Sequence, residues 1–418
     1  MKGKTKSLES SGKIEFQLRK FKDNNDEPGA DAGLGVLAKL KIESSYSFGY
    51  LKFEGLSFVD AKDPARNKMF IEDFFINSSF FNDQLVIRAG YQIFNWSDLE
   101  VFHPADVVNS IDYDSDLESF DKKGELTLSM EYPILSGELT LFLWPKIEKS
   151  IYPSENSRLG LGTEIAEPNW VIDNQVISKQ WNNQFGILVN QSIFKGDYKF
   201  HYIKHIDRKT PIIGNHSFAM TPVGPIPEDN IVNIPYYYEV VQFGFSLQQE
   251  LGDFLLKIEA IDKNYQSTKQ IATLNTATSA IELKQPLDYQ EVATGLEYNY
   301  YHDNSSESTF LLEYSFIPSH GKQLRSDISV FQNDFFFGHR YNFNNSSSRE
   351  LFYGFIIDLE RSNELFYTFS YSERLWDNLK IKFGVRIYDA PKENESEVGG
   401  MQLLEEADQV YINISNFF

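Results

Sequence analysis

The stretch DNLKIKFGVRIYDA, residues 377–390, decides the fold because its apolar and polar residues alternate. Successive side chains of a β-strand point to opposite faces, so a period of two predicts a strand with one apolar and one polar face. One face would carry Leu379, Ile381, Phe383, Val385 and Ile387, and the other Lys380, Lys382, Gly384 and Arg386. Such a strand fits a sheet that separates apolar surroundings from a wet interior.

The same period recurs along nearly the whole chain of 418 residues. In residues 83–94, DQLVIRAGYQIF, the residues Leu85 and Ile87 alternate with Val86 and Arg88. Counted in this way, the chain contains 18 segments, at 12–22, 32–44, 47–58, 69–81, 84–95, 123–133, 137–145, 180–191, 197–207, 235–249, 253–264, 288–301, 308–316, 327–343, 350–360, 364–373, 378–388 and 408–418.

The links between these segments alternate between short and long. Links after even-numbered segments are short, whereas long links run through 96–122, 146–179, 208–234, 265–287 and 389–407. The clear exception is the short link at 361–363. Turns at one rim, loops at the other and an even strand count are typical of bacterial outer-membrane barrels. We therefore predict an all-β, transmembrane, antiparallel up-and-down β-barrel of 18 strands, with short periplasmic turns and long extracellular loops.

The composition excludes several other classes of protein. The formal net charge of -21 argues against nucleic acid as a partner. No stretch approaches the roughly 18 consecutive apolar residues of a transmembrane helix, and the mean hydropathy is -0.38. The absence of cysteine excludes disulfides and thiolate metal sites. Aromatic residues make up 15% of the chain, which suits the aromatic girdles of membrane interfaces. We place such girdles at PYYYEV, EYNYYH, FFFGHRYNF and FYTFSYS.

The chain is predicted to form a single barrel over residues 12–418, preceded by a flexible segment at 1–11. The start, MKGKTKSLESSG, has no apolar stretch and is not a signal peptide. We therefore expect a protein of the outer membrane of a Gram-negative bacterium, exported with a signal peptide that is absent from this chain. Its surroundings would be outer-membrane lipid and lipopolysaccharide.

The polar faces of the strands would line the lumen, and their charges are mixed. A barrel of about 18 strands encloses a channel wide enough for water unless loops fill it. The basic candidates gather on segments that adjoin once the barrel closes, whereas the acidic ones lean towards segments 6 to 15. Either a transverse field orients polar solutes, or the opposed charges pair across the lumen. The pore-lining candidates are Arg19, Lys39, Lys41, Arg88, Gln92, Arg340, Lys380, Lys382, Arg386, Glu131, Glu259, Glu297 and Asp358.

The long link at 96–122 is a candidate constriction loop. Its acidic residues are interleaved with apolar ones that a fully solvated loop would not need. We therefore expect it to fold inward and narrow the pore. The acidic run could instead hold calcium, which favours carboxylate oxygens, although the spacing is not that of an EF-hand. His103 is expected to be structural rather than catalytic. The candidate residues of this loop are Trp96, Asp98, Asp106, Asn109 and Asp112.

Two stretches resemble porin-like outer-membrane proteins of Gram-negative bacteria, in families near the alginate-export-type barrels. RAGYQIFNWSDLEVFHPADVVNSID is similar to their G-x-Q-x-x-x-W-G-x-x-D…D-x-x-N-P-x-D stretch, except that Ser97 replaces Gly and Ser110 replaces Pro. FQNDFFFGHRYNFNN resembles a D-x-F-x-G-x-R-Y-x-x-N-D strand and turn. The resemblance covers residues 84–122 and 325–418 and implies an outer-membrane channel of unnamed solute. The matching residues are Gly90, Gln92, Trp96, Asp98, Asp106, Asn109 and Asp112, then Asp334, Phe336 or Phe337, Gly338, Arg340, Tyr341 and Asn344.

The sequence therefore predicts a porin-like channel that passes small polar or charged solutes through a charge-lined lumen. The alternative is a barrel that serves an export or envelope complex with a periplasmic partner, and a third hypothesis is an adhesin that uses the acidic loops. The 7 histidines form no recognisable catalytic motif, so we expect no enzyme. No cofactor or metal is expected either.

The chain ends on QVYINISNFF, residues 409–418. In this last segment Val410, Ile412, Ile414 and Phe418 would face lipid, and the segment would close the barrel by pairing with 12–22. A terminal Phe after alternating apolar residues resembles the signal that the outer-membrane assembly machinery reads. Phe418 is therefore the candidate assembly signal.

Overall fold

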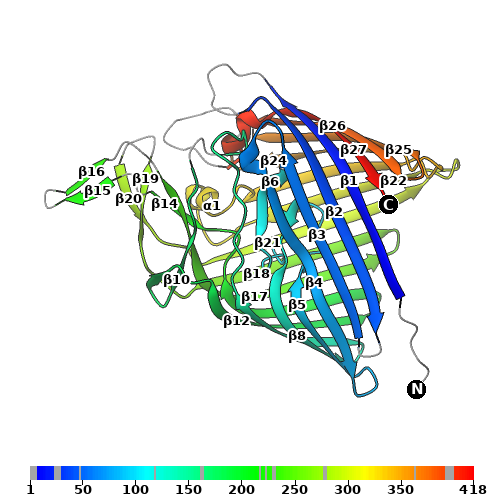
Figure 1. Cartoon of the computed structure of the whole chain (residues 1–418), viewed down its shortest axis with the longest axis horizontal. Coiled ribbons are helices and arrows are strands. Elements are labelled where there is room, and N and C mark those ends of the chain that lie inside the picture. The colour runs from blue at the N-terminus through cyan, green and yellow to red at the C-terminus, as the bar shows by residue number, and fades with distance from the viewer. Residues whose placement is uncertain are drawn as a thin grey trace.

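The computed structural model describes residues 7–22, 30–46, 49–116, 119–160, 164–215, 218–221, 224–227, 232–275, 280–361, 364–390 and 400–418. In these ranges, 18 strands form a closed barrel in which each strand pairs with the next barrel strand of the sequence, and the last pairs with the first. All these pairings are antiparallel, and closure leaves the sheet without an edge (Figure 1). The predicted up-and-down barrel is confirmed.

The barrel strands lie close to the predicted segments. They are β1 (Ser7–Phe21), β2 (Ala32–Tyr46), β3 (Gly49–Asp60), β4 (Lys68–Phe80), β5 (Leu85–Gln92), β8 (Glu125–Ile134), β9 (Gly137–Lys146), β12 (Trp181–Ile193), β13 (Gly196–Ile206), β17 (Asn233–Leu251), β18 (Phe254–Tyr265), β21 (Tyr289–Tyr301), β22 (Glu307–Phe316), β23 (Asn333–Asn342), β24 (Glu350–Asp358), β25 (Leu365–Trp376), β26 (Leu379–Asp389) and β27 (Gln409–Phe417).

Two boundaries differ from the prediction. β1 begins at Ser7 rather than at residue 12, and its first residues pair with β2, from Ser7 opposite Ser45 onward. The segment predicted at 327–343 overlaps the last two residues of the helix α1 (Lys322–Ile328), and β23 begins only at Asn333. In the described ranges, no helix has the length and apolarity that a membrane-spanning helix needs.

The links divide the barrel into a turn end and a loop end. The eight links that follow β2, β4, β8, β12, β17, β21, β23 and β25 are short and lie at the turn end. The longer links lie at the loop end and carry the remaining elements. These are η1 (Pro64–Arg66), β6 (Ile111–Asp116), β7 (Ser119–Lys122), β10 (Asn169–Ile172), β11 (Gln175–Ile177), β14 (Ile212–Asn215), β15 (Phe218–Thr221), β16 (Gly224–Pro227), β19 (Ile271–Asn275), β20 (Ala280–Lys284) and η3 (Gly400–Ala407).

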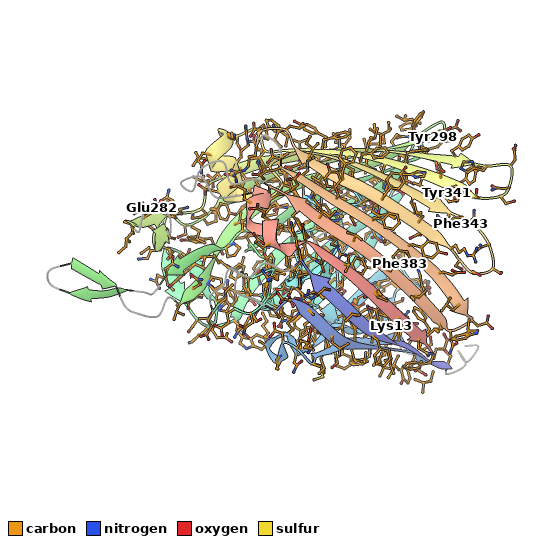
Figure 2. The ribbon with its side chains drawn as sticks, turned by 90° about the horizontal axis from the view of Figure 1, so that it is seen from above. Lys13, Glu282, Tyr298, Tyr341, Phe343 and Phe383 are labelled. Atoms are coloured by element: carbon orange, nitrogen blue, oxygen red, sulfur yellow. The ribbon has the colours of Figure 1, made fainter. Side chains whose placement is uncertain are left out.

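The two faces of the barrel wall differ as a membrane barrel requires. On β1, Ile14, Phe16 and Leu18 are exposed, whereas Glu15 between them is buried on the inner face. Aromatic side chains gather at the turn end, where Figure 2 shows Tyr298, Tyr341 and Phe343 far from the loop end. The alternation of exposed apolar and buried polar residues along the strands gives an apolar outer surface and a polar interior.

The aromatic run PYYYEV does not form a girdle, so that part of the prediction is wrong. Tyr236, Tyr237 and Tyr238 are at most 6% exposed. They lie where β17 continues beyond the barrel wall and is flanked by β14 and by the parallel strand β10. Both faces of this extension are covered, and the three tyrosines pack against residues such as Trp170 and Ile271.

The barrel closes between β27 and β1, with Ile412 opposite Leu18 in the register. Beyond the last strand, the backbones of Gly12 and Phe418 exchange two hydrogen bonds of 2.9 and 3.0 Å. A Cβ atom at Gly12 would lie 2.7 Å from the Phe418 ring, so a residue without a side chain is needed under that ring. Phe418 itself is 65% exposed on the outer face.

Candidate functional site

The link between β5 and β8, residues 93–124, is docked on the inner face of the wall. Glu259, which is fully buried on β18, accepts three of its hydrogen bonds. The Ser97 hydroxyl and the Asp98 amide donate to Oε1 of Glu259, both at 2.7 Å. The Ala105 amide donates to its other oxygen at 3.1 Å. One wall carboxylate thus holds both ends of the segment 97–105.

A second wall carboxylate holds the middle of the same segment. Glu313 on β22 is 3% exposed and accepts hydrogen bonds from three consecutive amides. The donors are Glu100 at 2.6 Å, Val101 at 3.0 Å and Phe102 at 3.1 Å. Successive backbone N–H groups curled around one anion form a nest, an arrangement that binds negative charge well.

Side chains of this link reach further strands. Lys199 on β13 forms an ion pair of 2.7 Å with Asp98, and Lys122 forms one of 2.6 Å with Asp106. Trp96 is 5% exposed and packs 5.6 Å from the Phe142 ring on β9. Lys199 and Asp98 are 101 residues apart in the sequence, so these contacts place the link against β9 and β13.

The hairpin β6–β7 forms the second half of the link. Asn109 fixes its start by donating to the backbone oxygens of Gln92, at 3.0 Å, and Lys123, at 2.8 Å. Asp112 is ion-paired with Lys68 on β4. Asp114 is ion-paired with Arg66, and its other oxygen lies 3.6 Å from Arg19 on β1.

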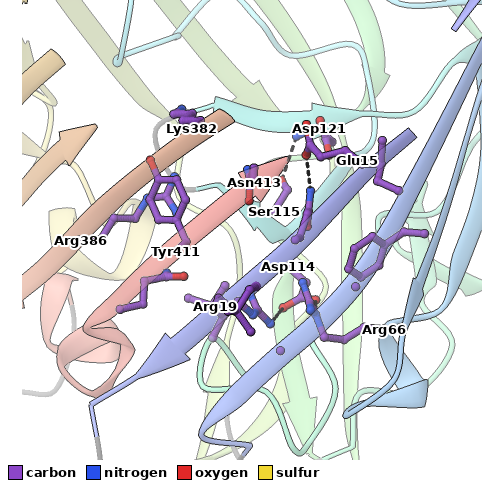
Figure 3. A pocket seen from close by; sticks show the side chains of 18 of the residues that line it. Glu15, Arg19, Arg66, Asp114, Ser115, Asp121, Lys382, Arg386, Tyr411 and Asn413 are labelled. Carbon is purple, nitrogen blue, oxygen red and sulfur yellow. Dashed lines mark hydrogen bonds and ion pairs between the residues drawn. The ribbon is translucent and has the colours of Figure 1, made fainter. Parts of the chain in front are cut away.

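A cavity of about 330 Å³ remains between this hairpin and the wall formed by β26, β27, β1 and β2. Figure 3 shows Arg386, Lys382 and Tyr411 on one side and Ser115 and Asp121 on the other. The guanidinium of Arg386 lies 4.4 Å from the centre of the Tyr411 ring, and the Lys382 amine lies 5.7 Å from it. The charged lining residues are Lys13, Arg19, Arg66, Lys68, Lys382 and Arg386, against Glu15, Asp114 and Asp121.

Of the predicted pore-lining residues, three meet at this cavity: Arg19, Lys382 and Arg386. Lys380 lies on the same face of β26 but nearer the turn end, outside the cavity. Most others form ion pairs, four with neighbouring residues of the wall and one with Glu100 of the docked loop. These pairs are Lys39–Glu54 at 3.1 Å, Lys41–Glu43 at 3.0 Å, Arg88–Glu131 at 3.3 Å, Glu297–Lys257 at 3.1 Å and Arg340–Glu100 at 3.3 Å.

Three of the predicted residues are covered by links instead of facing open lumen. Glu259 lies under the segment 97–105, as described above. Gln92 is 2% exposed at the end of β5, where Asn109 caps its carbonyl. Asp358 is 3% exposed and accepts hydrogen bonds from two amides of the link after β24.

His103 lies in the docked loop, with Nδ1 at 3.0 Å from the Ser97 hydroxyl. The Ser97 hydroxyl also lies 2.7 Å from Glu259 and donates to it, and the roles of donor and acceptor between Ser97 and His103 depend on the imidazole tautomer. Burial lowers the pKa of His103 to about 4. Burial raises the pKa of Asp106 less than Lys122 and Lys209 lower it, so that pKa lies below its usual range.

The acidic residues of the loop are matched by lysine and arginine. Asp106, Asp112 and Asp114 each have such a partner. In the described ranges, no three His, Asp or Glu side chains lie together as a metal-binding cluster. The side chains of residues 116–119 lie outside the described part of the structure. The hypothesis that the acidic residues of this loop bind calcium therefore stays a prediction.

Comparison with known proteins gives structural likeness only. No protein-family model matches the sequence, and no curated protein matches it. Among solved structures, OccAB3 of Acinetobacter baumannii is similar with a TM-score of 0.54 and 10% identity over 99% of each chain. The chain has the fold of an outer-membrane porin. OccAB1 of the same organism has a TM-score of 0.52 and 8% identity, over 99% of this chain and 96% of that one.

OccK5 (OpdH) of Pseudomonas aeruginosa is similar with a TM-score of 0.50 and 9% identity, over 99% of this chain and 98% of its own. Identities this low show the fold alone. They confirm, at that level, the resemblance to porin-like outer-membrane barrels that the motifs suggested.

Sequence reasoning missed several residues of the cavity. Tyr388 and Tyr411 occupy inward positions of β26 and β27, and the alternation alone could have placed them there. Lys68 stands one residue before its predicted segment. Arg66 lies in the short helix η1 of a link, where no period identifies a face.

Proposed function

We propose that the protein is an outer-membrane channel that passes small polar solutes and favours anions. The observation that carries this proposal is the lining of the 330 Å³ cavity, where six cationic side chains face three anionic ones. Charges on the wall of a narrow passage raise the local concentration of solutes of opposite sign.

The membrane setting is supported by the outer surface of the barrel. A closed barrel satisfies every strand amide internally, and its apolar outer face can therefore lie in lipid. We infer outer-membrane lipid and lipopolysaccharide as its surroundings, the turn end as periplasmic and the loop end as extracellular. We also infer that the assembly machinery of the outer membrane recognises the strand that ends in Phe418.

The docked loop supports selective rather than free passage. Its segment 97–105 is fastened to β18 and β22, so the loop covers that side of the lumen. Solutes would then pass along the opposite side, between Asp121 on the hairpin and Arg386 on β26 (Figure 3). Size selection and charge selection would act at the same place.

Recording from the purified protein in a planar bilayer under a potassium chloride gradient tests the proposal. The reversal potential should show a preference for chloride, and the double variant Lys382→Glu and Arg386→Glu should shift it towards potassium. Lys380→Glu is the matched control, since it changes the same charge on the same strand outside the cavity. An equal shift in the control, or an unchanged preference in the double variant, would contradict the proposal.

The same recording separates the channel from the alternative function. A barrel that serves an export complex would remain without current until a periplasmic partner is added. Current from the protein alone, blocked competitively by small carboxylates or phosphate, would favour the channel.

A further inference from the structure

Four oxygen-bearing side chains meet on the inner face of β22, β23 and β24, at the loop end and outside the cavity described above. In the register of the sheet, Asp334 lies directly opposite Ser315 on one side and Asp358 on the other. Gln332, just before β23, donates through Nε2 to Oδ2 of Asp358 at 2.7 Å. All four residues are at most 3% exposed.

Three oxygen atoms in this group have no hydrogen-bond partner although they are buried. They are Oδ1 of Asp334, the amide oxygen Oε1 of Gln332 and the hydroxyl oxygen of Ser315. A buried acceptor left without a donor is destabilising, and more so when it is charged. Native structures keep few such groups, and each one requires an explanation.

The positive charges of the neighbouring links are directed elsewhere. Arg325 of α1 is paired with Glu360, and Arg361 with Glu364 at 2.5 Å. Among the described residues, none forms an ion pair with Asp334 or Asp358 within 4 Å. In the described part of the chain, the two carboxylates therefore stand opposite each other in a buried place with no ion-pair partner within 4 Å, which is unfavourable unless a proton or a cation joins them.

We propose that Asp334, Asp358 and Gln332 bind a divalent cation, and that Ca²⁺ is the ion that fits. A proton shared between the carboxylates would leave the Gln332 oxygen without a partner, whereas a hard cation is a partner for all these oxygens at once. Two carboxylates balance the charge of a divalent ion. Ca²⁺ accepts carboxylate and amide oxygens in flexible geometry, while Mg²⁺ demands a near-ideal octahedron. The hydroxyl of Ser315 and lumen water can complete the shell.

The bound ion would fasten two links at the loop end. Asp358 accepts the amides of Glu360 and Arg361 at 2.8 Å each, so it already fixes the link after β24. Gln332 ends the link that contains α1. An ion between them would join the two links and stabilise this part of the rim.

Binding can be measured on protein refolded into detergent without lipopolysaccharide, which itself holds calcium. In equilibrium dialysis with ⁴⁵Ca²⁺ at about 1 mM, a concentration at which extracellular calcium modules bind, we expect Asp334→Asn to hold one ion per chain fewer than the natural sequence. Calcium should also raise the melting temperature of the natural protein but not that of the variant. Glu297→Gln, which removes a lumen carboxylate that is paired with Lys257, is the matched control and should bind like the natural protein.

A second variant keeps the test valid if Asp334→Asn fails to fold. Gln332→Glu adds a carboxylate at the same place and should bind calcium more tightly. Calcium binding that is equal in the natural protein and in both variants would overturn the proposal. So would a natural protein that ignores calcium but melts with a pH dependence that Asp334→Asn abolishes, because the carboxylates would then share a proton.

Discussion

The two sides of the lumen treat the inward loop in opposite ways. On β18 and β22, Glu259 and Glu313 accept six hydrogen bonds from it, and the loop lies on the wall. On β26, β27 and β1, the wall presents Lys382 and Arg386, and a cavity remains. Carboxylates only accept hydrogen bonds and suit a loop rich in free amides, whereas lysine and arginine only donate. The backbone amides of segment 97–105 therefore dock on the acidic side, whereas the hairpin meets the basic side through the side chains of Asp112 and Asp114 and leaves a cavity there.

Removing both docking carboxylates should give the largest effect. In the double variant Glu259→Ala and Glu313→Ala, five backbone amides and one hydroxyl lose their acceptor. At about 1–3 kcal/mol for each buried donor left unpaired, the docked loop should become unfavourable. We expect single-channel conductance to rise several-fold, because the loop no longer covers that side of the lumen.

The control for this experiment comes from the neighbouring strand. Glu297→Ala removes a carboxylate of the same wall that holds Lys257 rather than the loop. Its conductance should stay close to that of the natural protein. If both docking carboxylates can be removed without any change in conductance, the loop is not held by them.

The barrel wall could be predicted from the sequence because its cause is local. Each strand must present apolar residues to one side and polar residues to the other, so the period of two is visible within any ten residues, as in DNLKIKFGVRIYDA. The register then follows from closure, which sets Lys380 and Lys382 beside Ser415 and Asn413 of β27. The period of two is lost where a strand no longer separates an apolar side from a polar side. At Tyr237, for example, β17 is covered on both faces.

The docking of the loop could not be predicted in the same way. The partners Asp98 and Glu259 are 161 residues apart, and the donors are backbone amides that every residue possesses. Nothing in the local sequence marks them. The apolar residues of the loop indicated an inward fold, but the choice between β18 and β26 depends on the three-dimensional wall. The pairing of Arg88 with Glu131 likewise follows from strand neighbours that are distant in sequence.

The substitution Phe418→Ala should have a smaller effect, and on assembly rather than on passage; a deletion would leave Phe417 as a terminal Phe. Phe418 pairs with Gly12 where β27 meets β1, on the same side of the barrel as the cavity, and its ring packs over Gly12. We expect a several-fold lower yield of membrane-inserted protein, while barrels that do insert keep their conductance. Phe417→Ala retains a terminal Phe and serves as the control. Insertion that is normal in Phe418→Ala but impaired by Phe417→Ala would refute the role of Phe418 as the assembly signal.

Acidification should weaken the docked side through His103. Its pKa is about 4 in the docked loop and near 6.5 in a solvated loop. Because the docked loop favours the neutral ring, docking is fully stable above pH 6.5 and weakens as the pH falls towards 4, by up to about tenfold per pH unit.

Asp106, whose pKa is lowered, affects docking in a different pH range. Its carboxylate stabilises docking above its usual pKa and loses this effect only at lower pH, as it becomes protonated. Loop-release events in bilayer recordings should therefore increase between pH 6.5 and 4.5 in the natural protein and increase less in His103→Gln. Both proteins have the same wall carboxylates. The difference between their pH profiles therefore reports the protonation of the His103 imidazole alone. Identical pH profiles of the two proteins would contradict this prediction. They would mean that His103 stays buried and neutral when the loop moves, so the loop does not leave the wall.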